Sequence, residues 1–170
     1  LDDTYIGGKK KSGKRGRGAR SKVPIMVAVE SRPEGCGHVA LRKMAPFSSL
    51  QAKRFLQDNV DNDSAIISDG LHLYRPLKKR FNLSQTTLND GQKAAEVFPN
   101  VHRAIARLKT WIRGTHSHVS HKHLNQYLAE FSFRFNRRFK QRRDTIFDRL
   151  VTACGTAKTF PRNNMVAELA

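Results

Sequence analysis

The sequence predicts an α/β fold in which a mixed sheet is flanked by helices. Two short apolar runs rich in β-branched residues, 23–29 and 65–67, are typical of buried strands. Two longer segments, 96–113 and 120–135, repeat apolar residues at helical spacing. This order of elements favours mixed strand directions, and 170 residues are enough for one domain with a sizeable core.

The first predicted strand is expected to be part of a hairpin that leads into a helix. Residues 31–37 carry one Pro and two Gly and predict a turn. In 38–44, apolar residues alternate with polar or small ones, which predicts a second strand. Ser48 and Ser49 can cap a helix whose apolar residues are Leu50, Ala52, Phe55, Leu56 and Val60.

The remaining elements follow from the same patterns. The strand at 65–67 ends on Ser68-Asp69-Gly70, a short helix is expected at 71–77, and a strand at 81–88 is followed by a turn at 89–91. The long helices carry apolar stripes at Val101, Ile105, Leu108 and Ile112, then at Leu124, Tyr127, Leu128, Phe131 and Phe135. A last amphipathic helix presents Ile146, Phe147, Leu150 and Val151, and 156–170 form a tail with little pattern.

The charge balance is strongly basic. Lys and Arg number 32 and Asp and Glu number 14, so the formal net charge is +18. Such an excess indicates a polyanionic partner, most simply nucleic acid, with an anionic membrane surface as the competing partner. No apolar run is long enough to span a bilayer, and the first residues do not form a signal peptide. Cys36 and Cys154 do not form a C-x-x-C pair and are expected to be free thiols.

Much of the positive charge lies in one segment. Eight of the fourteen residues in 9–22 are Lys or Arg and three are Gly. Because the segment has no large apolar residue, it is expected to form a mobile basic loop. The candidate DNA contacts here are Lys9, Lys10, Lys11, Lys14, Arg15 and Arg17, and a solvated tail is the alternative.

The start of the chain suggests a strand that was cut part-way along. Leu1 is not a methionine, and the strand-like sequence at 2–6 follows at once. We therefore expect a fragment, or a truncated or misannotated reading frame, that lacks an N-terminal region.

Three acidic residues stand out as candidate metal ligands. Asp69 follows a short apolar strand, and strand ends are where ligand-binding groups gather in α/β sheets. Asp2 and Asp3 precede a strand-like step into Gly7-Gly8. Phosphodiester chemistry uses carboxylates that hold divalent ions, and Mg²⁺ prefers oxygen ligands. An ordinary Asp-Gly turn and solvated acids are the alternatives.

Four ordered motifs then resemble those of a large family of bacterial insertion-sequence transposases. They are Asp2-Asp3-Thr4-Tyr5-Ile6-Gly7-Gly8-Lys9-Lys10, Ile67-Ser68-Asp69-Gly70 with Tyr74-Arg75-Pro76-Leu77, Leu108-Lys109-Thr110-Trp111-Ile112-Arg113-Gly114-Thr115-His116, and Lys122-His123-Leu124-Asn125-Gln126-Tyr127-Leu128-Ala129-Glu130-Phe131-Ser132-Phe133-Arg134-Phe135-Asn136-Arg137-Arg138. The resemblance covers residues 1 to about 155, which would form the catalytic domain. It implies an RNase H-like fold with a truncated first strand and a DDE-type active site.

The resemblance also implies site residues. Asp2 would be the first metal-binding carboxylate and Asp69 the second. The third normally lies on a helix, seven residues before a Lys or Arg that contacts DNA. Counting back from Lys109 gives 109 − 7 = 102, which is His102 and not Glu.

The residues themselves support a role for this histidine. His102, Ala106, Lys109 and Arg113 share one helical face beside the apolar stripe, which suits a cleft that faces phosphate. Imidazole is a poorer ligand for Mg²⁺ than for Mn²⁺, so His102 is expected to bind a metal, orient water or shuttle a proton. Asn100 and Glu96 are the alternatives for the third position. The simplest alternative for His102 itself is a surface histidine without a role in the site.

Other residues are candidates of a weaker kind. Arg134, Arg137 and Arg138 are expected to reach DNA phosphates. Trp111 and the phenylalanines Phe131, Phe133 and Phe135 are expected to pack in the core. The spacing of His116, His118, His121 and His123 matches no zinc pattern, so DNA contact or plain surface is favoured.

The expected activity is metal-dependent cleavage at transposon ends, followed by attack of the freed 3′-hydroxyl on target DNA. The implied cofactor is Mg²⁺ or Mn²⁺, and the implied partner is double-stranded DNA, bound as a homo-oligomer in the bacterial cytoplasm at the nucleoid. Two rival functions stay open. One is an inactive DNA-binding remnant, and the other is a basic RNA-binding structural protein.

Overall fold

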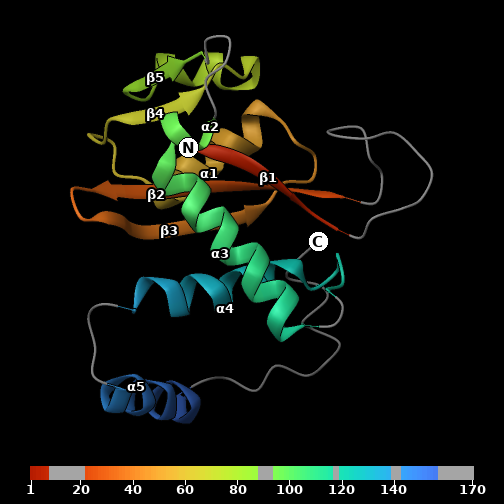
Figure 1. Cartoon of the computed structure of the whole chain (residues 1–170), viewed down its shortest axis with the longest axis vertical. Coiled ribbons are helices and arrows are strands. Elements are labelled where there is room, and N and C mark those ends of the chain that lie inside the picture. Colours follow the sequence, from red (N-terminus) through yellow and green to blue (C-terminus); the bar gives the residue numbers. More distant parts are fainter. Residues whose placement is uncertain (8–21, 88–93, 117–118, 139–142, 157–170) are drawn as a thin grey trace.

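A computed structural model describes residues 1–7, 22–87, 94–116, 119–138 and 143–156, apart from the side chains of 143–146 (Figure 1). Its elements are β1 (Asp2–Ile6), β2 (Val23–Arg32), β3 (Gly35–Lys43), α1 (Ser49–Asn59), β4 (Ile66–Asp69), the 3₁₀ helix η2 (His72–Lys79), β5 (Leu83–Thr86), α2 (Ala94–Val97), α3 (Pro99–Thr115), α4 (Leu124–Asn136) and α5 (Arg143–Thr156). The expected α/β class is confirmed.

The first three strands form an antiparallel sheet in the order β1-β2-β3. Asp2 pairs with Val27 at one end of the β1–β2 ladder, and Ile6 pairs with Val23 at the other. The first half of the central strand β2, residues 23–27, is apolar and buried on both faces. The hairpin to β3 turns tightly after Arg32, where Gly35 adopts a φ of 129° that other residues rarely tolerate.

A second, smaller sheet consists of β4 and β5, which run parallel over four residue pairs from Ile66↔Leu83 to Asp69↔Thr86. The backbone nitrogen of Leu1 donates a hydrogen bond of 2.7 Å to the carbonyl of Ile67 in β4. This bond joins the start of β1 to the smaller sheet. The strand orders remain β1-β2-β3 in the larger sheet and β4-β5 in the smaller one, with the start of β1 beside β4.

Two core clusters lie on opposite faces of β2, because successive side chains of a strand point to opposite sides. Ile25 and Val27 pack with apolar residues of α3 and α4. Met26, between them, packs with α1, η2, β4 and β5. Figure 1 shows α3 crossing the three-stranded sheet, in agreement with its contacts to all three strands.

Several element boundaries differ from the expectations, each for a local reason. The helix expected at 71–77 is a 3₁₀ helix, which suits a short segment with Pro76 inside it. The helix expected from 96 begins at Pro99, a residue preferred in the first helical turn, after the separate short helix α2. The cap at Ser48 is confirmed, because its hydroxyl accepts from the backbone nitrogen of Gln51.

The last helix has little packing on its apolar side. Phe147 and Val151 of α5 are 67% and 53% exposed. None of the helices within the described ranges is both long enough and apolar enough to cross a bilayer. The expected basic loop, except Lys22, and the expected turn at 89–91 and tail lie outside the described residues.

Candidate active site

Three carboxylates converge where β1 begins and β4 ends. Side-chain oxygens of Asp2, Asp3 and Asp69 all lie within 4.8 Å of one another. The hydrogen bond between Leu1 and Ile67 explains the convergence, because Asp2 directly follows Leu1 and Asp69 lies two residues after Ile67 in β4. Of the residues that the structure describes, these are the ones brought together as a possible metal-binding group.

The position of Asp69 is set by hydrogen bonds on both sides of its backbone. Its Oδ1 accepts from the backbone nitrogen of Leu71 at 3.3 Å, a local turn that aspartate commonly makes. The Nε2 of Gln85 donates to the carbonyls of Asp69 and Leu71, at 3.1 and 2.8 Å. The buried Ser68 hydroxyl also donates to the Asp69 carbonyl, at 3.2 Å. Residues of β4 and β5 therefore jointly fix this carboxylate.

The carboxylate of Asp2 is poorly compensated. Its side chain is only 16% exposed, and burial is the main cause that raises its pKa, with Asp69 adding to the rise. The backbone N–H of Asp3, which donates to Oδ1 at 2.7 Å, and the nearby His102 act in the opposite direction. A cation bound at this position would relieve the cost of keeping Asp2 ionised.

His102 is the expected third residue that the structure brings to this group. Its Nε2 lies 3.7 Å from Oδ2 of Asp2, too far for a hydrogen bond, and its side chain is 32% exposed. The Nε2 atom itself is buried and has no hydrogen-bond partner among the described residues. Asn100, by contrast, accepts from the Cys36 thiol, and Glu96 is exposed on the short helix α2.

A cationic face of α3 continues from His102. Burial is the main cause that lowers the pKa of Lys109. The neighbouring cations Lys22 and Arg113 lower this pKa further, whereas Asp2 raises it. Arg113 lies one turn further along and donates its Nε to the Lys109 carbonyl at 3.2 Å. The expected stripe of His102, Lys109 and Arg113 thus lies beside the buried residues of α3, next to the acidic group.

The arginines of α4 make contacts of another kind. Arg134 pairs with Glu130 at 3.0 Å, and Arg137 stacks on Phe133 at 3.7 Å. Arg138 donates to the carbonyls of Cys36, Gly37 and Phe135, and its guanidinium stacks on the Phe135 ring. Arg138 therefore ties α4 to the β2–β3 hairpin, a structural contact that the sequence pattern did not indicate.

The aromatic and histidine residues near the α3–α4 connection are packed together. Trp111 contacts the rings of His116 and Phe131, at centroid distances of 4.8 and 5.7 Å, and His116 contacts Tyr127 at 4.6 Å. The packing role expected for Trp111 is confirmed. His118 lies outside the described residues, as do Lys9, Lys10, Lys11, Lys14, Arg15 and Arg17.

Two contributors to the site were not fully anticipated. Asp3 was a candidate metal ligand together with Asp2, but the family resemblance assigned the first carboxylate to Asp2 alone, whereas the Asp3 carboxylate also lies within the group. Gln85 was not anticipated, since its amide reaches Asp69 only once β5 lies parallel to β4. No feature of the sequence around Gln85 signals this contact.

A comparison with known protein families matches the part of the chain that contains these residues. A family model described as ISXO2-like transposase domain matches residues 1–136. The match runs from the start of β1 to the end of α4, so it includes the three carboxylates, His102 and Lys109. No curated protein matches the chain.

Proposed function

The chain belongs to the ISXO2-like family of DDE-type insertion-sequence transposases, and from this premise we propose that it cleaves transposon-end DNA and joins it to target DNA. In the first reaction, water attacks a phosphodiester phosphorus, the bond to the 3′-oxygen breaks, and a 3′-hydroxyl is freed. In the second, this hydroxyl attacks a phosphorus of the target strand and displaces the target's own 3′-oxygen. Both reactions need negative charge to be stabilised on the reacting oxygens.

The convergence of Asp2 and Asp69 is the observation that supports this proposal most strongly. The donor set is made of carboxylate oxygens, which Mg²⁺ and Mn²⁺ prefer, and the raised pKa of Asp2 reflects an uncompensated charge. These residues therefore fit a divalent ion, with Asp3 as a further ligand. A bound divalent ion would polarise the phosphate and lower the pKa of attacking water.

His102 takes the third position of the site in this proposal. Its buried Nε2 lies beside Asp2 and offers one nitrogen ligand, which suits Mn²⁺ better than Mg²⁺. The same nitrogen could instead hold a water molecule or a proton at the Asp2 carboxylate. All three roles depend on the short distance to Asp2.

DNA phosphates bind along the cationic face of α3. Lys109 is partly buried among other cations, so a phosphate there would offset both burial and repulsion. Arg113 and Lys22 add further positive charge near Lys109, and Arg134 and Arg137 add cations at the end of α4. The basic residues Lys9, Lys10, Lys11, Lys14, Arg15 and Arg17 remain proposed DNA contacts. We propose that the chain acts on DNA as a homo-oligomer at the bacterial nucleoid, in the cytoplasm.

Strand cleavage on cognate DNA tests the proposal. The substrate is a plasmid that carries the genomic DNA flanking the coding sequence on both sides, incubated with the full chain and Mg²⁺ or Mn²⁺. New 3′-hydroxyl ends at the element boundaries are expected with the wild type and not with Asp69→Asn. Asp63→Asn, a change at an exposed aspartate, is the matched control and should cleave normally.

The rival function is a DNA-binding remnant without catalysis, and His102 in place of a carboxylate is the observation that favours it. It predicts that the chain binds the plasmid ends equally well with and without divalent ions, and that no strand is cut. That result would overturn the proposed activity. Metal-independent preference for RNA over duplex DNA would instead support an RNA-binding structural protein.

A further inference from the structure

The last helix, α5, carries an apolar face that is exposed. Phe147, Leu150 and Val151 are 67%, 46% and 53% exposed, and Cys154 is exposed as well. These four residues are spaced i, i+3, i+4 and i+7, so they share one side of the helix. Figure 1 shows α5 on the side of α4 that faces away from the sheets. The family match ends at residue 136, so α5 lies outside the matched domain.

The helix needs packing to be stable. It has 14 residues, a length at which an isolated helix is only marginally stable in water. Its second half contains Val151, Thr152, Gly155 and Thr156, which have low helix propensity. Every side chain that the structure describes in α5, from 147 to 156, is exposed. The apolar face is therefore the part of α5 through which a packing partner would stabilise it.

The charge of α5 distinguishes between the possible partners. The whole chain has a net charge of +18, whereas the segment 143–156 has two basic and two acidic residues and is neutral. DNA or an anionic membrane surface would favour a basic helix. Two copies of so basic a chain repel each other over most of their surface, and a neutral apolar helix is where they can approach with least repulsion.

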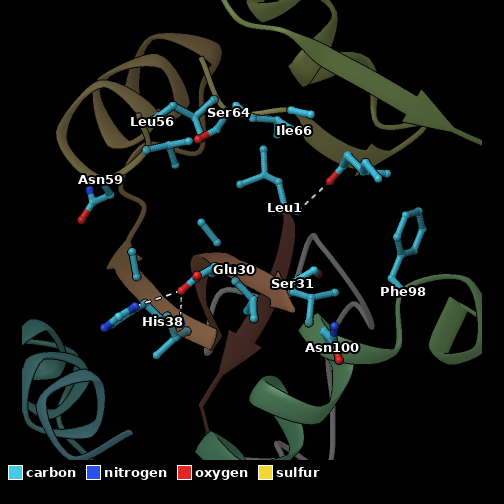
Figure 2. A pocket seen from close by; sticks show the side chains of 18 of the residues that line it. Leu1, Glu30, Ser31, His38, Leu56, Asn59, Ser64, Ile66, Phe98 and Asn100 are labelled. Atoms are coloured by element: carbon cyan, nitrogen blue, oxygen red, sulfur yellow. Dashed lines mark hydrogen bonds and ion pairs between the residues drawn. The ribbon is translucent and has the colours of Figure 1, made fainter. Parts of the chain in front are cut away.

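Other exposed apolar residues of the described chain do not form a comparable face. Leu50 on α1 and Ile67 on β4 lie singly, as surface apolar residues commonly do. Ile67 borders a cavity of about 1090 Å³, and Figure 2 shows the bonded pair of Glu30 and His38 at another part of its lining. That lining mixes charged and apolar groups, so α5 offers the more uniform apolar surface.

We infer that α5 is the interface through which two copies of this chain associate, each helix packing its apolar face against the same face of the other. A two-fold axis lets one surface serve both copies, so Phe147 and Leu150 are buried twice. The inference deepens the proposed function by giving the homo-oligomer an interface, but association through α5 requires neither DNA nor metal. A single pair of short helices buries less than the roughly 1,200 Å² of a stable interface, so the dimer should be weak.

Sedimentation equilibrium of the nuclease-treated full chain, without DNA or metal, tests this interface. Between about 1 and about 200 µM, the wild type should change from monomer to dimer. Leu150→Glu places a charge in the apolar face and should weaken the dimer at least about tenfold. Thr152→Glu adds the same charge on the opposite side of the helix and is the matched control. Added salt should strengthen the dimer, because it screens the repulsion between the basic domains.

The Cys154 thiol gives an independent measurement. In a Cys36→Ser chain, maleimide labelling of Cys154 should slow as the protein concentration rises, and Leu150→Glu should abolish this slowing. A wild type that stays monomeric at about 200 µM would overturn the inference, as would equal dimerisation of the two glutamate variants. A monomer whose Cys154 reacts slowly at every concentration would assign the face to the chain's own domain instead. A monomer that floats with phosphatidylserine vesicles would assign it to a membrane.

The outcome is separate from that of the cleavage assay. Loss of dimerisation in Leu150→Glu together with absent strand cleavage in the wild type would support the interface and overturn the proposed activity. Cleavage by a chain that stays monomeric without DNA would do the reverse. Because Leu150 and Thr152 are exposed, neither substitution should change the Tm of the domain.

Discussion

The Nε2 atom of His102 lies 3.7 Å from Oδ2 of Asp2, with no hydrogen-bond partner of its own among the described residues. The two side chains come from α3 and β1 and meet beside Asp69. A nitrogen therefore stands where an acidic residue is expected from the family resemblance.

Replacing this nitrogen by a carboxylate should change the metal preference of the site. In His102→Glu, like charges crowd the acidic group, so the Tm without metal should fall. Mg²⁺ should then raise the Tm more than in the wild type, because oxygen is its preferred ligand and bound metal stabilises the fold. Thermal unfolding with EDTA or Mg²⁺ measures both effects. Arg103→Glu, exposed on the same helix, is the control, and an equal Mg²⁺ response in the two variants would contradict this prediction.

Removing the charge of Asp2 should stabilise the metal-free protein. Burial raises the pKa of Asp2 in the folded state, so folding favours the protonated form, and stability is lost as pH rises through the folded pKa. Asp2→Asn should abolish this loss and raise the Tm at neutral pH in EDTA, with each 1 kcal/mol seen as roughly 2–4 °C.

We expect Mn²⁺ to raise the Tm of the wild type, and this increase should be lost in Asp2→Asn, because the variant lacks a ligand oxygen. Asp63→Asn is the matched control and should change neither property. A lower Tm for Asp2→Asn in EDTA would show that the carboxylate has a stabilising role in the absence of metal.

The Glu30 carboxylate should make the free energy of unfolding depend on pH in the direction opposite to that of Asp2. The hydrogen bond from Arg32 is the main cause that lowers the Glu30 pKa to about 2, and the His38 backbone N–H adds to it. The stabilisation is therefore present above the ordinary value of 4.5 and is lost as pH falls from there through about 2. Because the side chains are exposed, the effect should be at most about 1 kcal/mol. Urea unfolding of Glu30→Gln at neutral and acid pH, compared with the wild type, measures it; parallel pH profiles would contradict it.

Phosphate binding by Lys109 should appear in the salt dependence of DNA affinity. Loss of one phosphate contact reduces the slope of log K against log salt by about 0.9. Lys109→Ala should show this reduction on a short duplex of random sequence, measured by fluorescence anisotropy. Arg54→Ala, an exposed cation on α1, should leave the slope unchanged. Identical slopes for the two variants would remove Lys109 from the DNA-binding surface.

Arg138 should contribute more to the stability of the fold than to DNA binding. Its guanidinium bonds several carbonyls at once, which the single ammonium of lysine cannot reproduce. Arg138→Lys should therefore lower the free energy of unfolding by about 1–3 kcal/mol. Arg134→Lys, which keeps an exposed pair with Glu130, should change it by less than about 0.5 kcal/mol. Denaturant titration compares them, and equal stability would favour a DNA role for Arg138.

Local sequence patterns predicted individual helices and strands better than the long-range contacts between them. The helical spacing that placed His102 and Lys109 on one face and the strand end at Asp69 are local features, and the structure contains both. The contact between Leu1 and Ile67, which brings Asp2 to Asp69, joins residues 66 positions apart. Such a contact depends on the packing of the whole sheet and leaves no trace in periodicity.

The same limit applies to Asp3 and Arg138. The sequence named Asp2 and Asp3 as candidates, but their grouping with Asp69 depends on how β1 lies relative to β4, which periodicity does not give. The basic run at 134–138 indicated charge, yet the partners of Arg138 on the hairpin are about one hundred residues earlier in the chain.

The placement of Asp69 in the small β4–β5 sheet has a consequence for how the proposed activity is lost on heating. This sheet has four residue pairs, and the nitrogen of Leu1 beside β1 donates to its Ile67 carbonyl. Such a unit can open locally at a lower free-energy cost than the unfolding of the whole domain. Asp69 and Gln85, whose amide bonds the Asp69 carbonyl, would then separate from Asp2, so the proposed activity would be lost at a lower temperature than the helical core unfolds.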